Sequence, residues 1–401
     1  MRLPDDKSAF DLVAFYATAT DYARERLRAR GDELRLWAIT QAELRRKAVK
    51  KLPLALAACE FVFPTSLSAE QCTSEALAAF HASLVEPGCR GLDMTAGLGI
   101  DAMTLALKSA SVVAIDIDSD VAAALAHNAP LLGVDNLTAL AADSTEWLVQ
   151  KTEEQFGWIF IDPARRGSHG QRLYSLADCA PDVVGLLPEL RCHASRLVVK
   201  ASPMLDVTDT VRRLPGITDV YAVGTVTECK EVVAVVDLSD CTATTPRCHA
   251  VTVGPDGTWR DDVVDTTAEP RIAADVASAR WVAEPSPAMM KLNAGGWLCS
   301  RYGVEQIAAS THLFVSSAEE PPVGFPGRVY KVTLVADYGK RGCAAIRSAY
   351  RSANVTTRNF PDRPADVVRR LRIKEGGTAR FFVVRDASAR PCLIATEPAE
   401  A

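Results

Sequence analysis

The segment Asp93-Met94-Thr95-Ala96-Gly97-Leu98-Gly99 combines residue types and a spacing that suit ligand binding. The apolar residues before it predict a buried strand, and the apolar spacing after it predicts a helix. Gly97 and Gly99 permit backbone dihedrals that other residues avoid, and they let a ligand approach closely. A phosphate-binding turn would exclude a carboxylate, whereas Asp93 suits a cationic ligand. The segment therefore indicates S-adenosylmethionine (SAM), with its sulfonium and ammonium groups, before NAD or ATP.

Three further carboxylates follow predicted strands, in order along the chain. Asp116, with Asp118 as the second choice, ends a strand about twenty residues after the glycines, where a carboxylate can bind both ribose hydroxyls. Asp143 follows the next strand and could accept a hydrogen bond from an adenine amino group. Asp162 follows the fourth strand. Each carboxylate alone could be a helix cap, but the ordered series favours a cofactor site.

The candidate catalytic motif is Asp162-Pro163-Ala164-Arg165. Asp162 could orient a nucleophile or act as its base, and Arg165 could stack on a nucleobase or clamp a phosphate. Lys200, after the fifth predicted strand, could pair with Asp162 or contact the substrate. Alternatively, Lys200 only caps that strand.

Polar residues just upstream of the glycine strand are further candidates. Gln71 and Ser74 could reach the methionine carboxylate of SAM. Alternatively, Gln71 and Thr73 cap a helix. Cys72 is expected to serve packing, because nothing near it in the sequence lowers a thiol pKa. The six histidines are isolated, so surface or core positions are expected for each.

These residues need a parallel α/β sheet to position them, because ligands bind at the carboxyl ends of its strands. Strand and helix patterns alternate after about residue 86. Two further strands, Asp219–Val226 and Glu231–Leu238, would close the sheet as a hairpin, which distinguishes a methyltransferase-type sheet from the plain dinucleotide fold. Residues 1–85 are expected to be helical. The expected parallel strands are Gly91–Met94, Val112–Asp116, Leu137–Ala141, Trp158–Ile161 and Arg196–Lys200.

Composition places the chain among globular proteins of two or three domains, since it has 401 residues, 48% of them hydrophobic and 24% charged. No segment has the pattern of a signal peptide or a membrane span. The eleven cysteines are scattered, without zinc-site spacing. We therefore expect a cytoplasmic protein with no membrane association and no metal.

The net charge of −5 is unevenly distributed. Residues 325–401 hold 15 basic and 7 acidic side chains, whereas the middle of the chain is strongly acidic. A basic C-terminal module can neutralise nucleic-acid phosphates. The alternative is a solvated basic surface.

With these motifs the chain resembles the bacterial class I SAM-dependent methyltransferases that carry a C-terminal THUMP-like domain. The matching segments are Glu70–Glu75, Asp93–Gly99, Asp162–Arg166 and Arg358-Asn359-Phe360-Pro361. The resemblance implies a Rossmann-like, seven-stranded α/β methyltransferase sheet, a helical N-terminal extension, and ferredoxin-like and THUMP-like α+β modules. It also implies SAM as cofactor, and RNA binding by the C-terminal module, which agrees with its positive charge.

Domain boundaries follow from these patterns and from the Pro/Gly-rich segment 321–327. We expect a helical region over 1–85, a methyltransferase domain over 86–240, a linker or irregular β segment over 241–277, a ferredoxin-like module over 278–320 and a THUMP-like domain over 328–401.

Residues that are absent from the motif argue against two classes of methyl acceptor. Many amino-methylating enzymes of nucleic acids have Asp/Asn-Pro-Pro followed by an aromatic residue, but here Ala164 and Arg165 stand in the last two places. Uracil-C5 methylation needs a cysteine nucleophile after strand five, where this chain has Val199-Lys200-Ala201-Ser202-Pro203. Direct methyl transfer to a nucleobase nitrogen in RNA is the main hypothesis. The alternatives are a small-molecule methyltransferase and an inactive SAM- and RNA-binding module.

Overall fold

The computed structural model describes residues 8–165, 175–240, 242 and 245–399. The chain divides into two compact units. The first comprises residues 1–221, 231–247 and 253–260, and the second comprises residues 222–230, 248–252 and 261–401.

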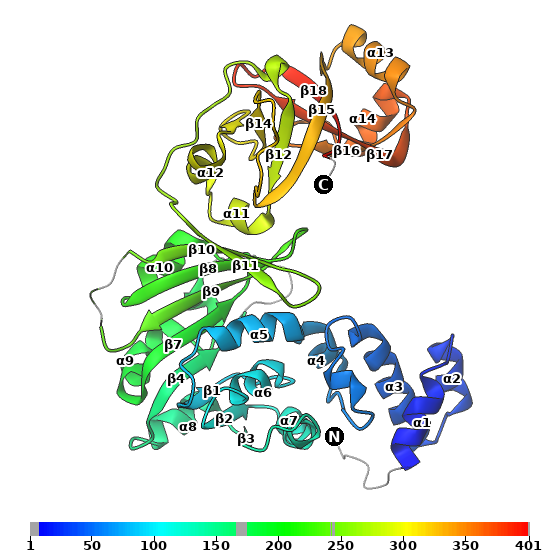
Figure 1. Cartoon of the computed structure of the whole chain (residues 1–401). Coiled ribbons are helices and arrows are strands. Elements are labelled where there is room, and N and C mark those ends of the chain that lie inside the picture. The colour runs from blue at the N-terminus through cyan, green and yellow to red at the C-terminus, as the bar shows by residue number, and fades with distance from the viewer. Residues whose placement is uncertain (1–7, 166–174, 241, 243–244, 400–401) are drawn as a thin grey trace. The chain divides into compact units, whose positions relative to one another are not determined.

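A nine-stranded sheet, most of whose strands belong to the first unit, has the strand order β11-β10-β8-β9-β7-β4-β1-β2-β3 (Figure 1). Strands β7, β4, β1, β2 and β3 are parallel, and β9 pairs with β7 in the antiparallel sense. All seven expected strands are present, including the closing pair β8 and β9. The strands are β1 (Arg90–Asp93), β2 (Ser111–Asp116), β3 (Leu137–Ala141), β4 (Phe156–Ile161), β7 (Ala194–Ala201), β8 (Ile217–Gly224), β9 (Cys229–Asp237), β10 (Arg247–Val253) and β11 (Trp259–Val264).

Buried apolar side chains hold the central strands in place. Leu92, Ile159 and Leu197, on three neighbouring strands, are fully buried in one core cluster. Such runs are typical of parallel strands that are covered on both faces. Trp158 is also fully buried, and its ring lies against Gly91, where a Cβ atom would come within 1.9 Å of it. Gly91 therefore allows β1 and β4 to pair at this point.

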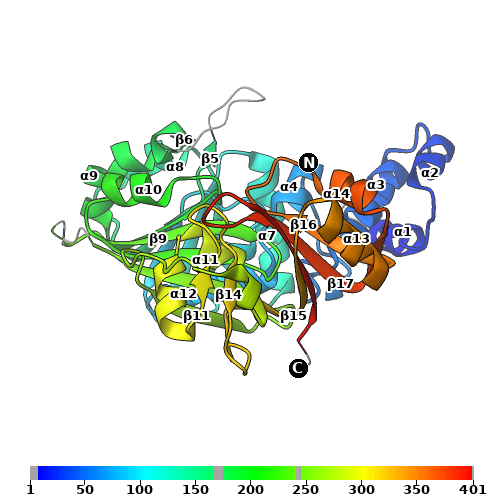
Figure 2. The ribbon, with the colours of Figure 1, turned by 90° about the horizontal axis from the view of Figure 1, so that it is seen from above.

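Helices begin where a side-chain oxygen can cap them. Asp118 caps α7 and Asp143 caps α8, each accepting from backbone amides of the first turn. In this unit α1, α2 and α3 lie next to one another (Figures 1 and 2) and share an apolar cluster of their own. The helices are α1 (Ser8–Tyr16), α2 (Tyr22–Arg28), α3 (Glu33–Ala48), α4 (Ser66–Gln71), α5 (Glu75–Ser83), α6 (Ile100–Ala106), α7 (Ser119–Leu131), α8 (Ser144–Gln150), α9 (Val183–His193) and α10 (Val207–Arg213), with the 3-10 turns η1 (Ala55–Ala57) and η2 (Leu176–Asp178). A two-stranded sheet joins β5 (Ala164–Arg165) and β6 (Cys179–Ala180).

The segment 241–277, expected to be linker or irregular β, contains the two regular strands β10 and β11. Most side chains of β11 are exposed or half-exposed, so the alternation of apolar residues that signals a strand is weak. Arg247 at the start of β10 pairs with the buried Asp219 of β8 at 2.8 Å. Backbone pairing at the sheet edge, which local sequence does not reveal, orders this segment.

A seven-stranded sheet is the framework of the second unit, with the strand order β13-β14-β12-β15-β18-β17-β16. Strands β12 and β15 pair in the antiparallel sense from Trp281↔Lys331 to Pro285↔Gly327. The expected ferredoxin-like and THUMP-like segments therefore share one continuous sheet. The elements are β12 (Trp281–Pro285), β13 (Glu305–Gln306), β14 (Phe314–Ser316), β15 (Gly327–Asp337), β16 (Ser352–Thr357), β17 (Lys374–Arg385), β18 (Pro391–Pro398), α11 (Pro287–Lys291), α12 (Gly295–Tyr302), α13 (Lys340–Ala349), α14 (Pro364–Leu371) and the 3-10 turn η3 (Val276–Ser278).

Two apolar clusters stabilise this second sheet. Ile346 of α13 and Leu371 of α14 are buried against Phe381 and Leu393 of the sheet, and Phe382 packs in a separate cluster with Val282. Within the described residues, no helix has both the length and the apolar character that a membrane crossing requires.

Candidate active site

A cavity of about 660 Å³ opens where the carboxyl ends of the parallel strands meet the helices that follow them. This size suits a nucleotide-sized ligand. It lies at the end of an open α/β sheet where ligands characteristically bind. Eight of the expected site residues line it: Gln71, Thr95, Gly97, Gly99, Asp116, Asp143, Asp162 and Lys200.

The glycine turn after β1 takes the conformation that its sequence predicts. Gly97 has a φ of +53° and Gly99 a φ of +85°, both in the left-handed region. A Cβ atom on Gly99 would lie 2.1 Å from Cδ1 of Leu125, whereas a Cβ atom on Gly97 would meet no atom within 4 Å. Gly99 is thus needed for packing against α7, and Gly97 leaves open space beside its backbone.

Asp116 is fixed by two backbone amides. Its Oδ2 accepts a hydrogen bond from Gly97 N at 2.9 Å, and its Oδ1 accepts one from Asp118 N at 2.9 Å. A carboxylate has about four lone-pair sites, so both oxygens can still accept hydrogen bonds from a ligand. Asp118, the second choice from the sequence, uses its own carboxylate to cap α7.

Asp93 lies beneath the glycine turn, and the described lining of the cavity does not include it. Its side chain is 1% exposed, and its Oδ1 accepts from Thr95 N at 2.9 Å. Burial raises the pKa of Asp93 to about 8, and the Thr95 amide only partly offsets this. The Asp93 side chain therefore fixes the backbone of the turn. A direct contact between Asp93 and the cationic part of a ligand, which the sequence suggested, stays a prediction.

Asp143 combines a structural contact with a position on the cavity. Its Oδ1 accepts from Thr145 N at 2.9 Å and from Glu146 N at 3.2 Å. Ser74 caps α5 through an Oγ that accepts from Leu77 N, and it is not among the described lining residues. Gln71, at the end of α4, is exposed and lines the cavity.

The structure describes only part of the candidate catalytic motif. Asp162 lines the cavity, Pro163 is buried behind it, and the side chain of Arg165 lies outside the described part of the chain. The backbone amide of Asp162 donates to Thr95 Oγ1 at 2.7 Å. The turn after β1 and the motif after β4 are therefore joined directly.

Lys200 pairs with Asp162, one of the two arrangements proposed from the sequence. Its Nζ lies 2.6 Å from Asp162 Oδ2. The Asp162 side chain keeps 41% of its surface exposed, but that surface faces the cavity. Desolvation in this recess raises the pKa of Asp162, against the opposing effect of the Lys200 ammonium.

Behind Lys200 lies a buried chain of charged groups that sequence reasoning missed. Lys200 Nζ also lies 3.2 Å from Asp101 Oδ2, and the other oxygen of Asp101 contacts His81 Nδ1 at 2.7 Å. His81 Nε2 contacts Glu231 Oε1 of β9 at 2.6 Å. Thr73 adds a hydroxyl that donates to Asp101 and accepts from Lys200. Anions and cations therefore alternate from Asp162 through Lys200, Asp101 and His81 to Glu231.

The pKa values of these buried side chains follow from the alternation of charges. Burial disfavours a charged His81, but Glu231 and Asp101 outweigh it and raise its pKa to about 9. Burial likewise opposes the charge on Lys200, but Asp101 and Asp162 raise its pKa far above the ordinary value. Burial alone would raise the pKa of Asp101, yet Lys200 and His81 hold it well below its usual range. His81 is therefore protonated and Asp101 ionised at neutral pH, and Lys200 is held as an ammonium beside Asp162.

Cys72 is the only cysteine among the described residues that line the cavity. Burial raises the pKa of its thiol, and its Sγ donates to the Ala69 carbonyl. It therefore lacks the thiolate character of a nucleophile.

Comparison with known proteins gives matches in both units. Residues 327–398 match the model of a family described as THUMP domain-like, and residues 281–326 match one described as a ferredoxin-like domain. The solved structure of a candidate methyltransferase from Porphyromonas gingivalis W83 is 26% identical, covers 100% of both chains and has a TM-score of 0.87. The chain has the class I SAM-methyltransferase fold, extended by ferredoxin-like and THUMP-like domains.

Among curated proteins, similarity extends over shorter stretches of this fold. The 23S rRNA (uracil(1939)-C(5))-methyltransferase RlmD of Photobacterium angustum is 33% identical over 120 residues, which cover 29% of this chain and 54% of that protein. The protein of the same name from Marinomonas posidonica is 32% identical over 107 residues, covering 26% of this chain and 24% of that protein. The chain thus matches about half, or less, of the length of these relatives.

Proposed function

We propose that this protein is a SAM-dependent methyltransferase that methylates a nucleobase nitrogen in RNA by direct displacement. The observation that carries the proposal is the Asp162–Lys200 pair on the same cavity as the glycine turn and Asp116. One cavity thus holds both a nucleotide-type binding turn and a carboxylate suited to orienting an acceptor.

The residues present fit SAM as the cofactor. Asp116 retains acceptor capacity toward ribose hydroxyls, and the space beside Gly97 leaves its backbone accessible. Asp143 and Gln71 line the same cavity, and we assign Asp143 to the adenine amino group and Gln71 to the methionine carboxylate. Bound SAM supplies a methyl group on a positively charged sulfur. Asp93, Thr95 and Gly99 would keep the turn in shape.

Asp162 is the residue that we assign to the acceptor. Lys200 holds Oδ2 in a fixed place, which leaves Oδ1 to accept a hydrogen bond from an exocyclic or ring N–H. That bond aligns the nitrogen lone pair with the methyl group, and such positioning is the main contribution that an enzyme makes to a displacement of this kind. Because burial raises the pKa of Asp162, the carboxylate can also take the proton that the nitrogen loses.

A nitrogen acceptor is preferred to carbon 5 of uracil, although the curated relatives are named for the latter reaction. Addition at carbon 5 needs a thiolate beside the ring. At the end of β7 this chain has Lys200-Ala201, followed by Ser202, and the thiol of Cys72 is kept protonated by burial. Neither place provides the nucleophile.

RNA is preferred as the acceptor because of the second unit. It contains the THUMP domain-like segment, and residues 325–401 carry a large excess of basic side chains. Positive charge of this kind binds phosphates without regard to sequence. None of the ten described cysteines is in a disulfide, which agrees with action in the reducing cytoplasm.

The roles of the two carboxylates are separable by experiment. With labelled SAM and bulk RNA, Asp162→Ala should retain SAM affinity by calorimetry but lose methyl transfer by about a hundredfold or more. Asp116→Ala should weaken SAM binding by roughly ten- to a hundredfold, since it removes hydrogen bonds to a charged group.

Asp135→Asn is the matched control, because this exposed carboxylate lies away from the cavity lining. It should change neither quantity. Near-normal turnover by Asp162→Ala would remove Asp162 from the mechanism, and absence of SAM binding by the unaltered protein would overturn the proposal.

A further inference from the structure

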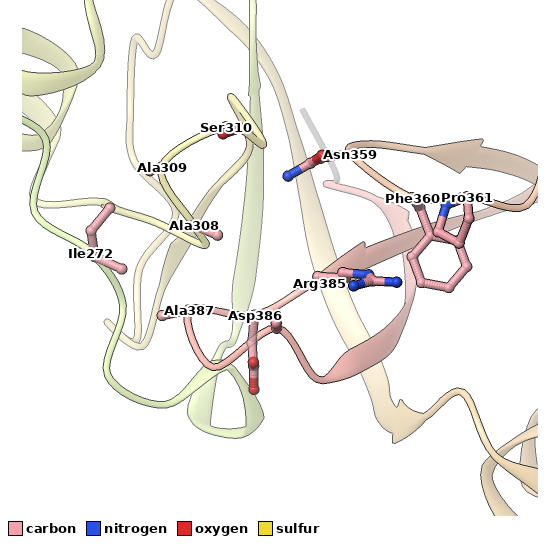
Figure 3. Close-up of a pocket in the computed structure, with 11 residues that line it drawn as sticks. Ile272, Ala308, Ala309, Ser310, Asn359, Phe360, Pro361, Arg385, Asp386 and Ala387 are labelled. Atoms are coloured by element: carbon pink, nitrogen blue, oxygen red, sulfur yellow. The ribbon is translucent and has the colours of Figure 1, made fainter.

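A second cavity, of about 880 Å³, lies wholly within the second unit (Figure 3). One side is formed by Ile272 and by the loop Ala308-Ala309-Ser310. The other side is formed by Asn359-Phe360-Pro361 after β16 and by the turn from Arg385 to Ala389 between β17 and β18. The methyl-transfer proposal makes no use of this cavity, although the segment Arg358–Pro361 stood out in the sequence.

Arg385 brings an unpaired positive charge to this cavity. It ends β17, is exposed, and extends toward Phe360 and Pro361 in Figure 3. Among the described residues its guanidinium has no hydrogen-bond or ion-pair partner. The neighbouring Asp386 is already occupied, because it accepts from Arg390 Nε at 3.0 Å and from the amides of Ser388 and Arg390. Arg385 is therefore free to bind an anion.

Asn359 contributes a carboxamide that can donate and accept at once. It has a φ of +47°, a conformation that asparagine tolerates better than most residues. Its side chain is exposed and has no partner within the described residues. In Figure 3 it extends toward the side formed by Ala308–Ser310.

Firm packing on both sides holds Asn359 in this conformation. Just before it, the Arg358 amide donates to the Val383 carbonyl, and its guanidinium pairs with Glu284 at 2.9 Å. Just after it, the Phe360 ring packs edge-to-face on Tyr338 at 5.2 Å between centroids. The unpaired carboxamide is thus displayed by a rigid turn.

Most of the remaining lining is apolar, and its polar members are Ser310 and Asp386. Ile272 keeps 39% of its surface exposed, and Ala308, Ala309, Ala387 and Ala389 add only methyl groups. A planar ring could cover these groups without displacing any larger side chain. These groups match the parts of a nucleotide. A cation binds the phosphate, an amide forms hydrogen bonds with the base edge, and an apolar surface packs against the base ring.

We infer that this cavity binds one single-stranded nucleotide of the RNA acceptor, with its phosphate on Arg385 and its base edge on Asn359. The inference rests on the proposed function for the identity of the macromolecule. The same chemistry could also hold a free nucleotide, so the experiment includes both sources.

The test uses the full chain and four variants. Arg385→Ala removes the cation, and Arg385→Lys keeps the charge but loses the planar fork. Asn359→Gly removes the carboxamide while glycine keeps the left-handed backbone. Arg351→Ala is the control, because Arg351 is an exposed arginine of the same unit that does not line the cavity.

Binding is measured by fluorescence anisotropy with labelled single-stranded RNA and by calorimetry with nucleoside monophosphates. Arg385→Ala should weaken RNA binding about tenfold and lower the slope of log affinity against log salt by about 0.7. Arg385→Lys should restore that slope but only part of the affinity. Asn359→Gly should weaken binding of some base sequences more than others. Arg351→Ala should have a clearly smaller effect than Arg385→Ala.

The outcomes separate this inference from the proposed function. Equal losses for Arg385→Ala and Arg351→Ala, with methyl transfer intact, would overturn the nucleotide site alone. Loss specific to Arg385 and Asn359 in a protein that transfers no methyl group would support the site and overturn the transferase. Tight binding of monophosphates without RNA binding would show a small-molecule site instead and contradict the inference. An unaltered protein that binds acidic peptides but no nucleotide would overturn it as well.

Discussion

At the scale of single residues, the site depends on paired charges held away from solvent. Removing one member of such a chain leaves its neighbour unpaired in a medium of low dielectric constant, which is costly. The position of Asp162 therefore depends on residues that never touch a ligand. We expect His81 and Asp101 to act as positioning residues through Lys200.

A histidine variant tests this with a defined pH dependence. His81 has a pKa of about 9 in the folded protein, compared with about 6.5 in an unfolded chain. Since the folded pKa is the higher one, the stabilisation is complete below about pH 6.5 and is lost as pH rises through about 9. The difference in Tm between the unaltered protein and His81→Gln should therefore be largest near pH 6 and should shrink toward pH 9.

The control for this measurement is His127→Gln, since the His127 ring contacts the Glu60 carbonyl instead of two carboxylates. A Tm difference for His81→Gln that is independent of pH would contradict the charged chain. In the active protein, His81→Gln should also lower kcat more than it weakens SAM binding, because the residues that we propose for SAM, such as Asp116, have no described hydrogen bond or ion pair with the His81–Asp101–Lys200 chain.

Some of these site residues could be predicted from the sequence, whereas others could not, for a physical reason. Asp116 ends a strand, and Asp143 and Asp162 lie one or two residues after one, so a local pattern places each of them at the carboxyl edge of the sheet. His81, Asp101 and Glu231 lie on two helices and a strand, with His81 and Glu231 separated by 150 residues. The only hint was a histidine among the apolar residues of α5, and that pattern also fits an ordinary core position. The partners of such a group are set by tertiary packing.

At the scale of elements, the turn from β1 to α6 shows how two glycines can serve different purposes. Gly99→Ala would place a methyl group against Leu125 and force a left-handed residue, with a combined cost of roughly 2–4 kcal/mol. Gly97→Ala meets no atom, so only the backbone cost of about 1–2 kcal/mol applies. By urea unfolding, Gly99→Ala should be clearly the more destabilising.

The order of the two variants should be reversed for SAM binding, with the larger loss of affinity in Gly97→Ala. Gly97→Ala fills space beside the proposed cofactor, so its SAM affinity should fall by more than its stability explains. Adding Leu125→Ala to Gly99→Ala should recover part of the stability lost at Gly99. The absence of any such recovery would mean that the clash with Leu125 is not the cause.

Element boundaries in the parallel sheet could be predicted well, because each strand is a short apolar run followed by a polar turn. The expected strands Gly91–Met94 and Arg196–Lys200 correspond to β1 and to most of β7. Strands β10 and β11 were not foreseen as regular strands, since their order comes from pairing at the sheet edge. Local propensity carries little information about such pairing.

At the scale of the whole molecule, the second unit joins two family segments in one sheet. Strand β15 pairs with β12 on one side and with β18 on the other. A chain ending at residue 326 would lack β15 and leave the edge of β12 unpaired. An edge exposed in this way destabilises the remaining sheet and promotes aggregation.

Limited proteolysis can measure this dependence. In the truncated chain, residues 281–326 should lose the protease resistance that they have in the full chain. The matched control is the substitution of Arg351 by Ala in the full chain, which should leave resistance unchanged. Full protection of 281–326 after truncation would show that the ferredoxin-like segment folds independently.

The central claim is that this protein methylates a nucleobase nitrogen in RNA, and nucleoside mass spectrometry tests it most directly. RNA from cells with and without the gene is digested to nucleosides, and the modified species are compared. The account predicts that one N-methylated nucleoside is lost when the gene is absent and returns with the unaltered protein, but does not return with Asp162→Ala. Loss of 5-methyluridine, or no difference between the two RNA samples, would contradict it.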